Sequence, residues 1–412
     1  MASTAAQLKQ RADYTHKHNL NAGRHGWLRL TPAYSVKIVE ELIESCGRPM
    51  RILDPFCGTA TTALIAAYHG HQGVTTDINP FLVWLGQAKT AHYFPKDIVA
   101  TRKACVCALG FLKEKTNGAF VSSPPPIHNI ERWWSSNSLR FLCALKGALE
   151  TVTEEGTPER SLLFVAFCRT LIAVSNAAFN HQSMSFKDDD QFQLNIDIDL
   201  HALFEHDVET VLRGAEHNPD GSGRVSIGDS RSVAKCVDGL FDRVITSPPY
   251  ANRMSYIREL RPYMYWLGFL KDGRDAGELD WAAIGGTWGI ATSRLTGWKA
   301  TAGHFQSSIL DWAVGRIAHQ DNKNGELLSK YVEKYFGDIW VHLMGLRPVL
   351  NRGAEIHYIV GNSTFYGILL PVEQLYAEML RQLGFSNIEC RTIRKRNSKK
   401  ELIEFDVAAV WP

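Results

Sequence analysis

Residues 51–62 read RILDPFCGTATT and decide the fold. The first four residues predict a short apolar strand, which runs into a loop with a single glycine, Gly58, and then a helix over 63–69. A second strand over 73–76 ends on Asp77, 19 residues after the glycine. This order of strand, loop, helix, strand and acid predicts the opening of a doubly wound α/β domain.

The composition of the chain is that of an ordinary globular protein. Of its 412 residues, 45% are hydrophobic and 21% are charged, and 45 Lys and Arg against 43 Asp and Glu give a net charge of +2. These values exclude a disordered chain and a collagen-like repeat. Because the net charge is close to zero, a surface that binds nucleic acid must be a local basic patch.

The chain carries no signal for a membrane or for secretion. No stretch is long and apolar enough to span a bilayer, and the first 20 residues lack the apolar centre of a signal peptide. The eight cysteines are scattered, without the spacing of a zinc knuckle. We therefore expect a cytoplasmic protein with reduced thiols, no metal site and no membrane partner.

The rest of the chain predicts one interrupted domain. Residues 1–90 and 221–412 carry the α/β pattern, and 91–220 predict a mostly helical insertion. Strands are predicted at 224–229, 241–246, 355–360, 387–394 and 405–411, and helices over 133–152, 161–178, 325–350 and 372–383.

The loop around Gly58 has the chemistry of a ligand site. A glycine lets a ligand approach the backbone, and the following helix start offers N–H groups to a carboxylate or phosphate. In nucleotide-binding α/β domains, an acid at the end of the second strand accepts hydrogen bonds from a ribose, and Asp77 occupies this position. One glycine, rather than the three of a dinucleotide loop, favours a nucleoside that carries an amino acid. A plain strand-to-helix turn is the alternative.

A second motif, TSPPY, occupies residues 246–250 at the end of an apolar strand. Open α/β sheets hold their active sites at such strand ends. The two prolines lack N–H groups and stiffen the backbone, so carbonyl oxygens stay free for a ligand. Ser247 and the Pro248 carbonyl are suited to accept hydrogen bonds from an exocyclic amine, with Tyr250 stacked on its ring. An ordinary Pro-Pro turn is the alternative.

Together the two motifs resemble those of the amino-group DNA methyltransferases that use S-adenosylmethionine. Asp54-Pro-Phe-x-Gly-Thr resembles the cofactor motif of this family, and Thr-Ser-Pro-Pro-Tyr resembles its catalytic motif. The Ser-Pro-Pro-Tyr form is typical of cytosine-N4 enzymes, whereas adenine-N6 enzymes more often have Asp or Asn at the serine. The resemblance includes 25–33 and 225–229, and covers about 20–90 and 221–412.

The resemblance implies a doubly wound Rossmann-like methyltransferase sheet and a set of site residues. Asp54 would accept from the cofactor's amino group or order the loop, Phe56 would pack on the cofactor and Asp229 would lie near its adenine. Cys57 is expected to fill space in the loop. The expected catalytic residues are Ser247, Pro248, Pro249 and Tyr250; those for the cofactor are Thr31, Asp54, Phe56, Cys57, Gly58, Thr59, Asp77 and Asp229; those for DNA are Arg253, Arg258, Arg394, Lys395 and Arg396.

The implied activity is site-specific transfer of a methyl group to the N4 amine of a cytosine in double-stranded DNA. The target base must be flipped out of the duplex, and the helical insertion is the candidate region for target recognition. The family context implies a restriction–modification or defence system, with a cognate restriction endonuclease as a partner. An adenine-N6 DNA enzyme, an RNA guanine-N2 enzyme and a non-catalytic DNA-binding protein remain as alternatives.

Overall fold

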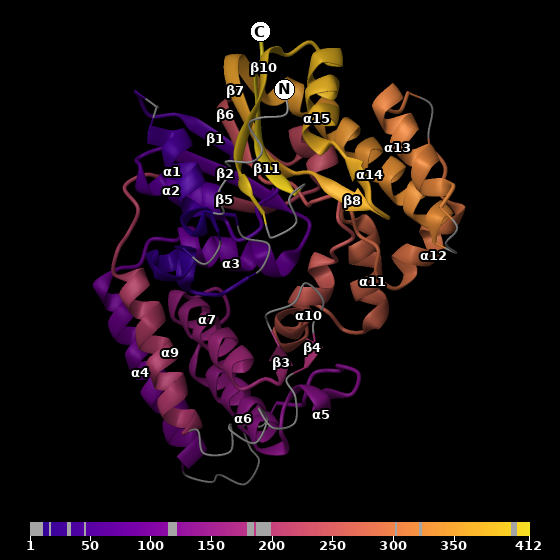
Figure 1. Cartoon of the computed structure of the whole chain (residues 1–412). Helices are drawn as coiled ribbons and strands as arrows, with labels where there is room; N and C mark the ends of the chain where they lie inside the picture. The colour runs from indigo at the N-terminus through magenta and orange to yellow at the C-terminus, as the bar shows by residue number, and fades with distance from the viewer. Residues whose placement is uncertain are drawn as a thin grey trace.

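A seven-stranded sheet forms the centre of the computed structural model (Figure 1). From edge to edge its strands are β10 (Ser386–Lys395), β11 (Ile403–Val410), β7 (Leu350–Gly361), β6 (Phe241–Thr246), β1 (Arg51–Asp54), β2 (Gln72–Asp77) and β5 (Ser222–Ile227). Strand β11 is antiparallel to both of its neighbours, and the other neighbouring pairs are parallel. This order confirms the predicted doubly wound α/β sheet.

The structure describes most of the chain. Among the residues that the structure describes, no helix is both long enough and apolar enough to cross a membrane. The described residues are 11–15, 18–30, 34–44, 47–113, 122–178, 185–186, 199–300, 303–320, 324–396 and 402–412.

Helices cover both faces of the sheet (Figure 1). Neighbouring residues of β1 face opposite sides, since Ile52 packs with the first helices of the chain and Leu53 with the later ones. A parallel sheet covered in this way needs strands that are apolar on both faces. The helices are α1 (Val36–Glu44), α2 (Thr61–Tyr68) and α3 (Pro80–Thr90) on one side, and α14 (Gly325–Leu346) and α15 (Val372–Gln382) on the other, with α13 (Ser308–Ala318) against α14.

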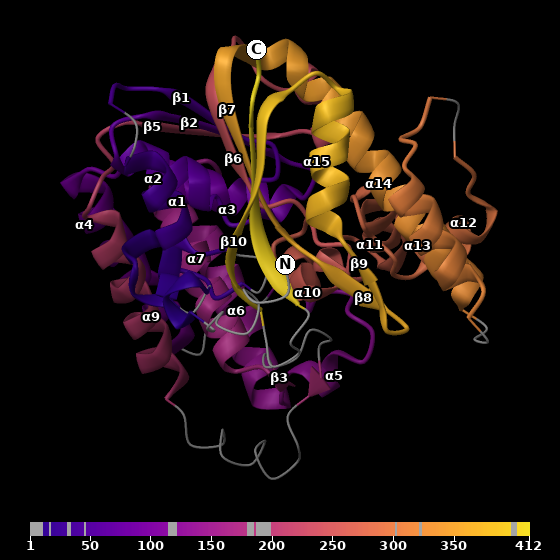
Figure 2. The same ribbon diagram turned by 45° about the horizontal axis from the view of Figure 1, so that its top comes forward.

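Shorter elements complete the fold. Two further helices, α11 (Gly273–Ala282) and α12 (Ile290–Gly297), lie beside α13 and α14 (Figures 1 and 2). The two-stranded ribbons are β3 (Ala177–Ala178) with β4 (Ser185–Phe186) and β8 (Ser363–Phe365) with β9 (Ile368–Leu370), and the 3₁₀ turns are η2 (Ala12–Tyr14), η3 (His18–Asn21), η4 (Gly23–Gly26), η5 (Ser230–Lys235) and η6 (Arg347–Val349).

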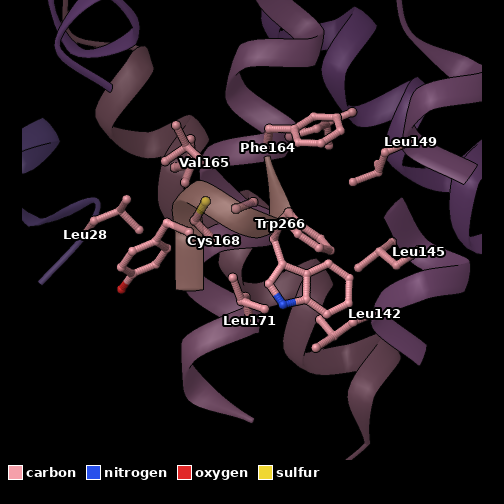
Figure 3. Packing of buried hydrophobic residues seen from close by; sticks show 14 of the residues in the cluster. Leu28, Leu142, Leu145, Leu149, Phe164, Val165, Cys168, Leu171 and Trp266 are labelled. Atoms are coloured by element: carbon pink, nitrogen blue, oxygen red, sulfur yellow. The ribbon is translucent and has the colours of Figure 1, made fainter. Parts of the chain in front are cut away.

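The segment between β2 and β5 is mostly helical, as predicted, and forms a second layer below the sheet in Figure 1. Its helices are α4 (Pro95–Lys113), α5 (Ile130–Trp133), α6 (Ser136–Val152), α7 (Pro158–Ala173) and α9 (Leu200–Ala215). Leu142, Phe164 and Cys168 pack in its core around Trp266 (Figure 3). Trp266 belongs to α10 (Tyr256–Trp266), which follows the TSPPY motif. The predicted domain boundaries stay a prediction, because this core includes α3 and α10 from outside 91–220.

Arg24 of η4 joins the two layers from within the protein interior. It is fully buried and donates five hydrogen bonds, to the carbonyls of Lys89, Ala91, Gly214 and Ala215 and to the Asn218 side chain. These acceptors lie at the ends of α3 and α9 and in the loop that leads to β5. A buried charge is tolerated here because every donor group has an acceptor.

Three predicted helices are shorter than expected. The helix over 133–152 is divided, because Ser135 caps the start of α6 by accepting from the Ser138 N–H. The helix over 161–178 ends at Ala173, since the chain then turns into β3. The helix over 325–350 ends at Leu346, because Pro348 cannot continue it.

The packing of α2 on β2 depends on Gly73. A Cβ atom added to Gly73 would lie 2.5 Å from the carbonyl oxygen of Ala63 and 2.6 Å from its Cα atom. We expect Gly73→Ala to lower the free energy of unfolding by about 2–3 kcal/mol, because the backbone of α2 must move away. Urea unfolding measures the effect.

The matched control is Gly337→Ala in the middle of α14, where an added Cβ meets nothing within 4 Å. This change should raise the free energy of unfolding by about 0.5–1 kcal/mol, as alanine favours a helix. Equal effects of the two substitutions would contradict the close approach at Gly73.

Candidate active site

A cavity of about 340 Å³ lies at the carboxyl ends of β1, β2, β5 and β6. The strand order reverses between β1 and β6, and doubly wound sheets bind ligands outside the strand ends at this point. The volume falls within the roughly 300–1,000 Å³ of small-molecule sites. The predicted site residues that line the cavity are Phe56, Cys57, Gly58, Thr59, Asp77, Asp229, Ser247, Pro248, Pro249, Tyr250, Arg394 and Arg396.

Asp54 lies beneath the loop that follows β1 and does not line the cavity. Its Oδ1 accepts hydrogen bonds from the Phe56 N–H at 3.0 Å and from the Thr246 hydroxyl at 2.6 Å. Burial raises the pKa of Asp54 to about 7. These contacts correspond to loop ordering, which was one of the two roles predicted for this residue.

Asp77 ends β2 and faces the cavity. Its two oxygens accept from the N–H groups of Gly58 at 3.0 Å and Asn79 at 2.9 Å. Gly58 has a φ of +50°, a left-handed conformation in which glycine is favoured. Burial raises the pKa of Asp77 to about 6. The carboxylate therefore both shapes the loop and presents acceptor oxygens to a ligand.

Thr59 completes the loop and also lines the cavity. Its backbone N–H has no hydrogen-bond partner among the described residues. Its carbonyl accepts from the Nζ of Lys89 at 3.1 Å. Lys89 is fully buried, and burial lowers the pKa of its ammonium group to about 8. Lys89 was not expected at the site, because a lysine in the last turn of a helix is ordinary and no local pattern marks it.

Asp229 lines the cavity beyond β5 and is held by Arg231. The Arg231 guanidinium contacts both carboxylate oxygens of Asp229, which holds the pKa of that acid below its usual value against the effect of burial. Arg231 also donates to Asp338 of α14 and to the carbonyl of Ala282. The orientation of Asp229 is therefore fixed before any ligand arrives.

Phe56 packs edge-on against His342, with the ring centroids 4.8 Å apart. His342 is fully buried, and burial lowers its pKa to about 4, so the ring is neutral. Its Nδ1 lies 2.9 Å from the Ser230 carbonyl and its Nε2 lies 2.6 Å from the Tyr358 hydroxyl. Because a carbonyl can only accept, Nδ1 carries the proton and Nε2 accepts from Tyr358.

The backbone carbonyls of the TSPPY motif differ in their hydrogen-bond partners. The Pro249 carbonyl accepts from the Tyr335 hydroxyl at 2.7 Å, and the Tyr250 carbonyl accepts from the Asn252 N–H. The Pro248 carbonyl has no hydrogen-bond partner in the described part of the chain. The Ser247 hydroxyl donates to the Ile359 carbonyl at 3.1 Å, so its lone pairs remain as acceptors.

The basic residues expected at DNA differ in their positions. Arg394 pairs with Glu404 at 2.7 Å, and Arg396 lies over the Tyr250 ring, so both belong to the cavity wall. Lys395 is half-buried and does not line the cavity. Arg253 is exposed beside the cavity with a φ of +61°, and Arg258 is half-buried on α10. Contact of these residues with DNA stays a prediction.

The N-terminal segment contributes residues that sequence reasoning missed. Tyr14, Tyr34 and Ser35 line the cavity, and the hydroxyl of Tyr34 bonds to that of Thr62 in α2. His25, at the start of the predicted N-terminal cofactor segment, is buried and lies outside the cavity lining. Thr31, which was expected at the cofactor, lies outside the described residues.

The chain is similar over most of its length to several type II methyltransferases. It is 22% identical to M.BsoBI of Geobacillus stearothermophilus, over 96% of this chain and 86% of that protein. It is 21% identical to M.MvaI of Kocuria varians, over 82% of this chain and 76% of that protein. It is 21% identical to M.AvaI of Anabaena variabilis, over 90% of this chain and 80% of that protein. No protein-family model matches the chain.

Among solved structures, the chain matches the rRNA methyltransferase aviRa from Streptomyces viridochromogenes. The two share 11% sequence identity over 92% of this chain and 86% of that chain, with a TM-score of 0.26. That score supports no argument about this protein, so the fold assignment depends on the strand order and pairing described above.

The buried carboxyl groups of Asp54 and Asp77 make stability depend on pH. In the folded protein, burial raises the pKa of Asp54 to about 7 and that of Asp77 to about 6, above the ordinary value of 3.8. Because the folded protein binds these two protons more tightly than the unfolded chain, they stabilise the fold. This stabilisation is complete below about pH 4 and is lost as the pH rises through 6 to 7. We expect the ligand-free protein to lose stability over this range, as measured by urea unfolding.

In Asp54→Asn the curve of stability against pH should be flatter between pH 5 and pH 8, because residue 54 no longer titrates. Asp220→Asn, at an exposed site, serves as the control and should follow the native curve. Parallel curves for native protein and Asp54→Asn would contradict the raised pKa.

Proposed function

We propose that this protein is a DNA methyltransferase that transfers a methyl group from S-adenosylmethionine to the N4 amine of a flipped cytosine, in a restriction–modification system. One observation carries the proposal: the acceptors Ser247 and Pro248 lie in the same cavity as the Asp77 carboxylate. The similarity to type II methyltransferases over most of the chain supports it.

The residues of the cavity fit S-adenosylmethionine. Asp77 offers carboxylate oxygens to ribose hydroxyls, and Asp229 offers an acceptor beyond the next strand. The unpaired N–H of Thr59, before the start of α2, suits the carboxylate of an amino acid. Phe56 supplies an apolar surface near Asp229. When bound, the cofactor supplies an electrophilic methyl group on a positively charged sulfur.

The protein's part in the reaction is to hold the amine. The N4 lone pair of cytosine is delocalised into its ring, so the amine is a weak nucleophile. The Ser247 oxygen and the Pro248 carbonyl would accept one N–H each and draw the nitrogen toward tetrahedral geometry. The Ser247 hydroxyl donates to the Ile359 carbonyl at 3.1 Å, which supports an acceptor role for its oxygen toward the amine.

The base must leave the duplex before it can reach these acceptors. Flipping costs a few kcal/mol, which stacking on an aromatic ring offsets in part. Tyr250 is the aromatic residue next to the two acceptors, and burial raises the pKa of its hydroxyl, which therefore stays protonated. We assign it the stacking role.

Nucleoside mass spectrometry tests the proposal directly. Unmethylated bacterial genomic DNA is incubated with the protein and S-adenosylmethionine, and N4-methylcytosine is the expected product. Ser247→Ala should lower its rate of formation about 100-fold, because one acceptor of the amine is lost. N6-methyladenine would overturn the base assignment. An absence of modified DNA bases, from protein that binds S-adenosylmethionine, would overturn the enzyme assignment in favour of RNA methylation or non-catalytic DNA binding.

Asp77 provides a separate test of the cofactor site. We expect Asp77→Asn to weaken S-adenosylmethionine binding about tenfold or more, because a hydrogen bond to a charged acceptor is lost. In the native protein the affinity should fall as the pH drops below about 6, where Asp77 takes up a proton. Isothermal titration at pH 5 to pH 8 measures both effects. A flat native curve, or an unchanged affinity in the variant, would contradict the ribose role.

A further inference from the structure

The hydroxyl of Tyr250 is held by a buried acid of the β10–β11 hairpin. It donates to Oε1 of Glu404 at 2.7 Å, and Glu404 is 4% exposed. The other oxygen of Glu404 accepts from Nε of Arg394 at 2.7 Å. The charge of the acid is therefore balanced by Arg394, and its orientation is set from two sides.

The ring of Tyr250 has a second contact in the same hairpin. The guanidinium carbon of Arg396 lies 4.5 Å from the ring centroid, in a cation–π arrangement. Nη1 of Arg396 donates to the Asn362 carbonyl at 3.0 Å. A Cβ atom added to Gly361 would lie 2.5 Å from this Nη1, so the guanidinium occupies space that a glycine leaves open. The protein backbone therefore holds Arg396 against the ring.

These contacts come together through strand pairing. Glu404 of β11 lies directly opposite Gly361 of β7, so the acid and the space for Arg396 are neighbours in the sheet. Tyr250, Glu404, Arg394 and Arg396 all line the cavity beside Ser247. A ring that must stack on a base has to be held in one orientation, because a small misplacement slows the reaction strongly.

We propose that Glu404 and Arg396 are positioning residues that hold the Tyr250 ring in place to stack on the substrate base. The inference rests on the proposed function, and it gives Arg396 a role inside the cavity wall. A basic run at a hairpin otherwise suggests contact with DNA phosphates, and the two roles make different demands on the side chain. A phosphate contact needs only a charge, whereas the stack needs the planar guanidinium.

Substitutions of Arg396 separate these roles. In Arg396→Lys and Arg396→Met we expect kcat for methyl transfer to genomic DNA to fall about tenfold, with the KM for DNA and the affinity for S-adenosylmethionine unchanged. The salt dependence of DNA binding should stay the same. Arg352→Met, on the exposed surface of β7, is the control and should keep native rates. Native kcat in Arg396→Lys, or a weaker salt dependence in Arg396→Met, would overturn the proposal in favour of a phosphate contact.

A double-mutant cycle tests Glu404. Tyr250→Phe removes only the hydroxyl that Glu404 binds, and Glu404→Gln keeps the shape of the acid without its charge. Each change should lower kcat about tenfold, and the double variant should be no slower than the slower single one. Additive losses would overturn a role of Glu404 through Tyr250. Thermal unfolding of each variant shows whether it is folded.

The two proposals fail in distinguishable ways. If the native protein methylates no DNA, the proposed function is wrong. The orientation of the Tyr250 ring is then compared between crystal structures of the native protein and of Arg396→Met. A displaced or multiply oriented ring in the variant supports the positioning role. A Tyr250 ring in its native orientation in that variant overturns it.

Discussion

The hydrogen bond between Thr246 and Asp54 is the contact on which the site depends. It joins the last residue of β1 to the last residue of β6, at 2.6 Å and with both residues fully buried. Breaking this hydrogen bond would leave a buried carboxyl group without that partner, which costs free energy, so the bond is strongly favoured in the folded protein. The same oxygen of Asp54 orders the loop through the Phe56 N–H. The two motifs, almost 200 residues apart in the chain, are therefore held in one geometry.

The sheet was largely predictable, because its signals are local. Arg51–Asp54 and Phe241–Thr246 were expected with the bounds that the structure has, since both are apolar runs that end at an acid or at Ser-Pro-Pro. Both strands are covered on two faces, and their central residues Ile52, Leu53, Val244 and Ile245 are apolar and buried. The loop around Gly58 and the TSPPY motif were predicted for the same reason: each site is built from consecutive residues at one strand end.

The parts that were missed depend on contacts between distant segments. Lys89, His342 and Tyr34 have no neighbours in sequence that suggest a ligand site. Arg394 and Arg396 stand in a basic run that suggests a DNA surface, yet the register of β11 on β7 sets Glu404 and Gly361 beside them. Strand register decides which side chains meet, and a single sequence does not show the register of strands that are far apart.

The position of the helical layer between β2 and β5 also governs how the chain assembles. During synthesis β2 can pair with β1, but its other edge has no partner until Ser222–Ile227 has been made. An open strand edge invites association between growing chains. The helices α4, α6, α7 and α9 of this layer pack on one another, and segments rich in contacts between neighbouring helices fold quickly. Early folding of this layer shortens the loop that β5 must close, and so limits the time for which a nascent chain is exposed to aggregation.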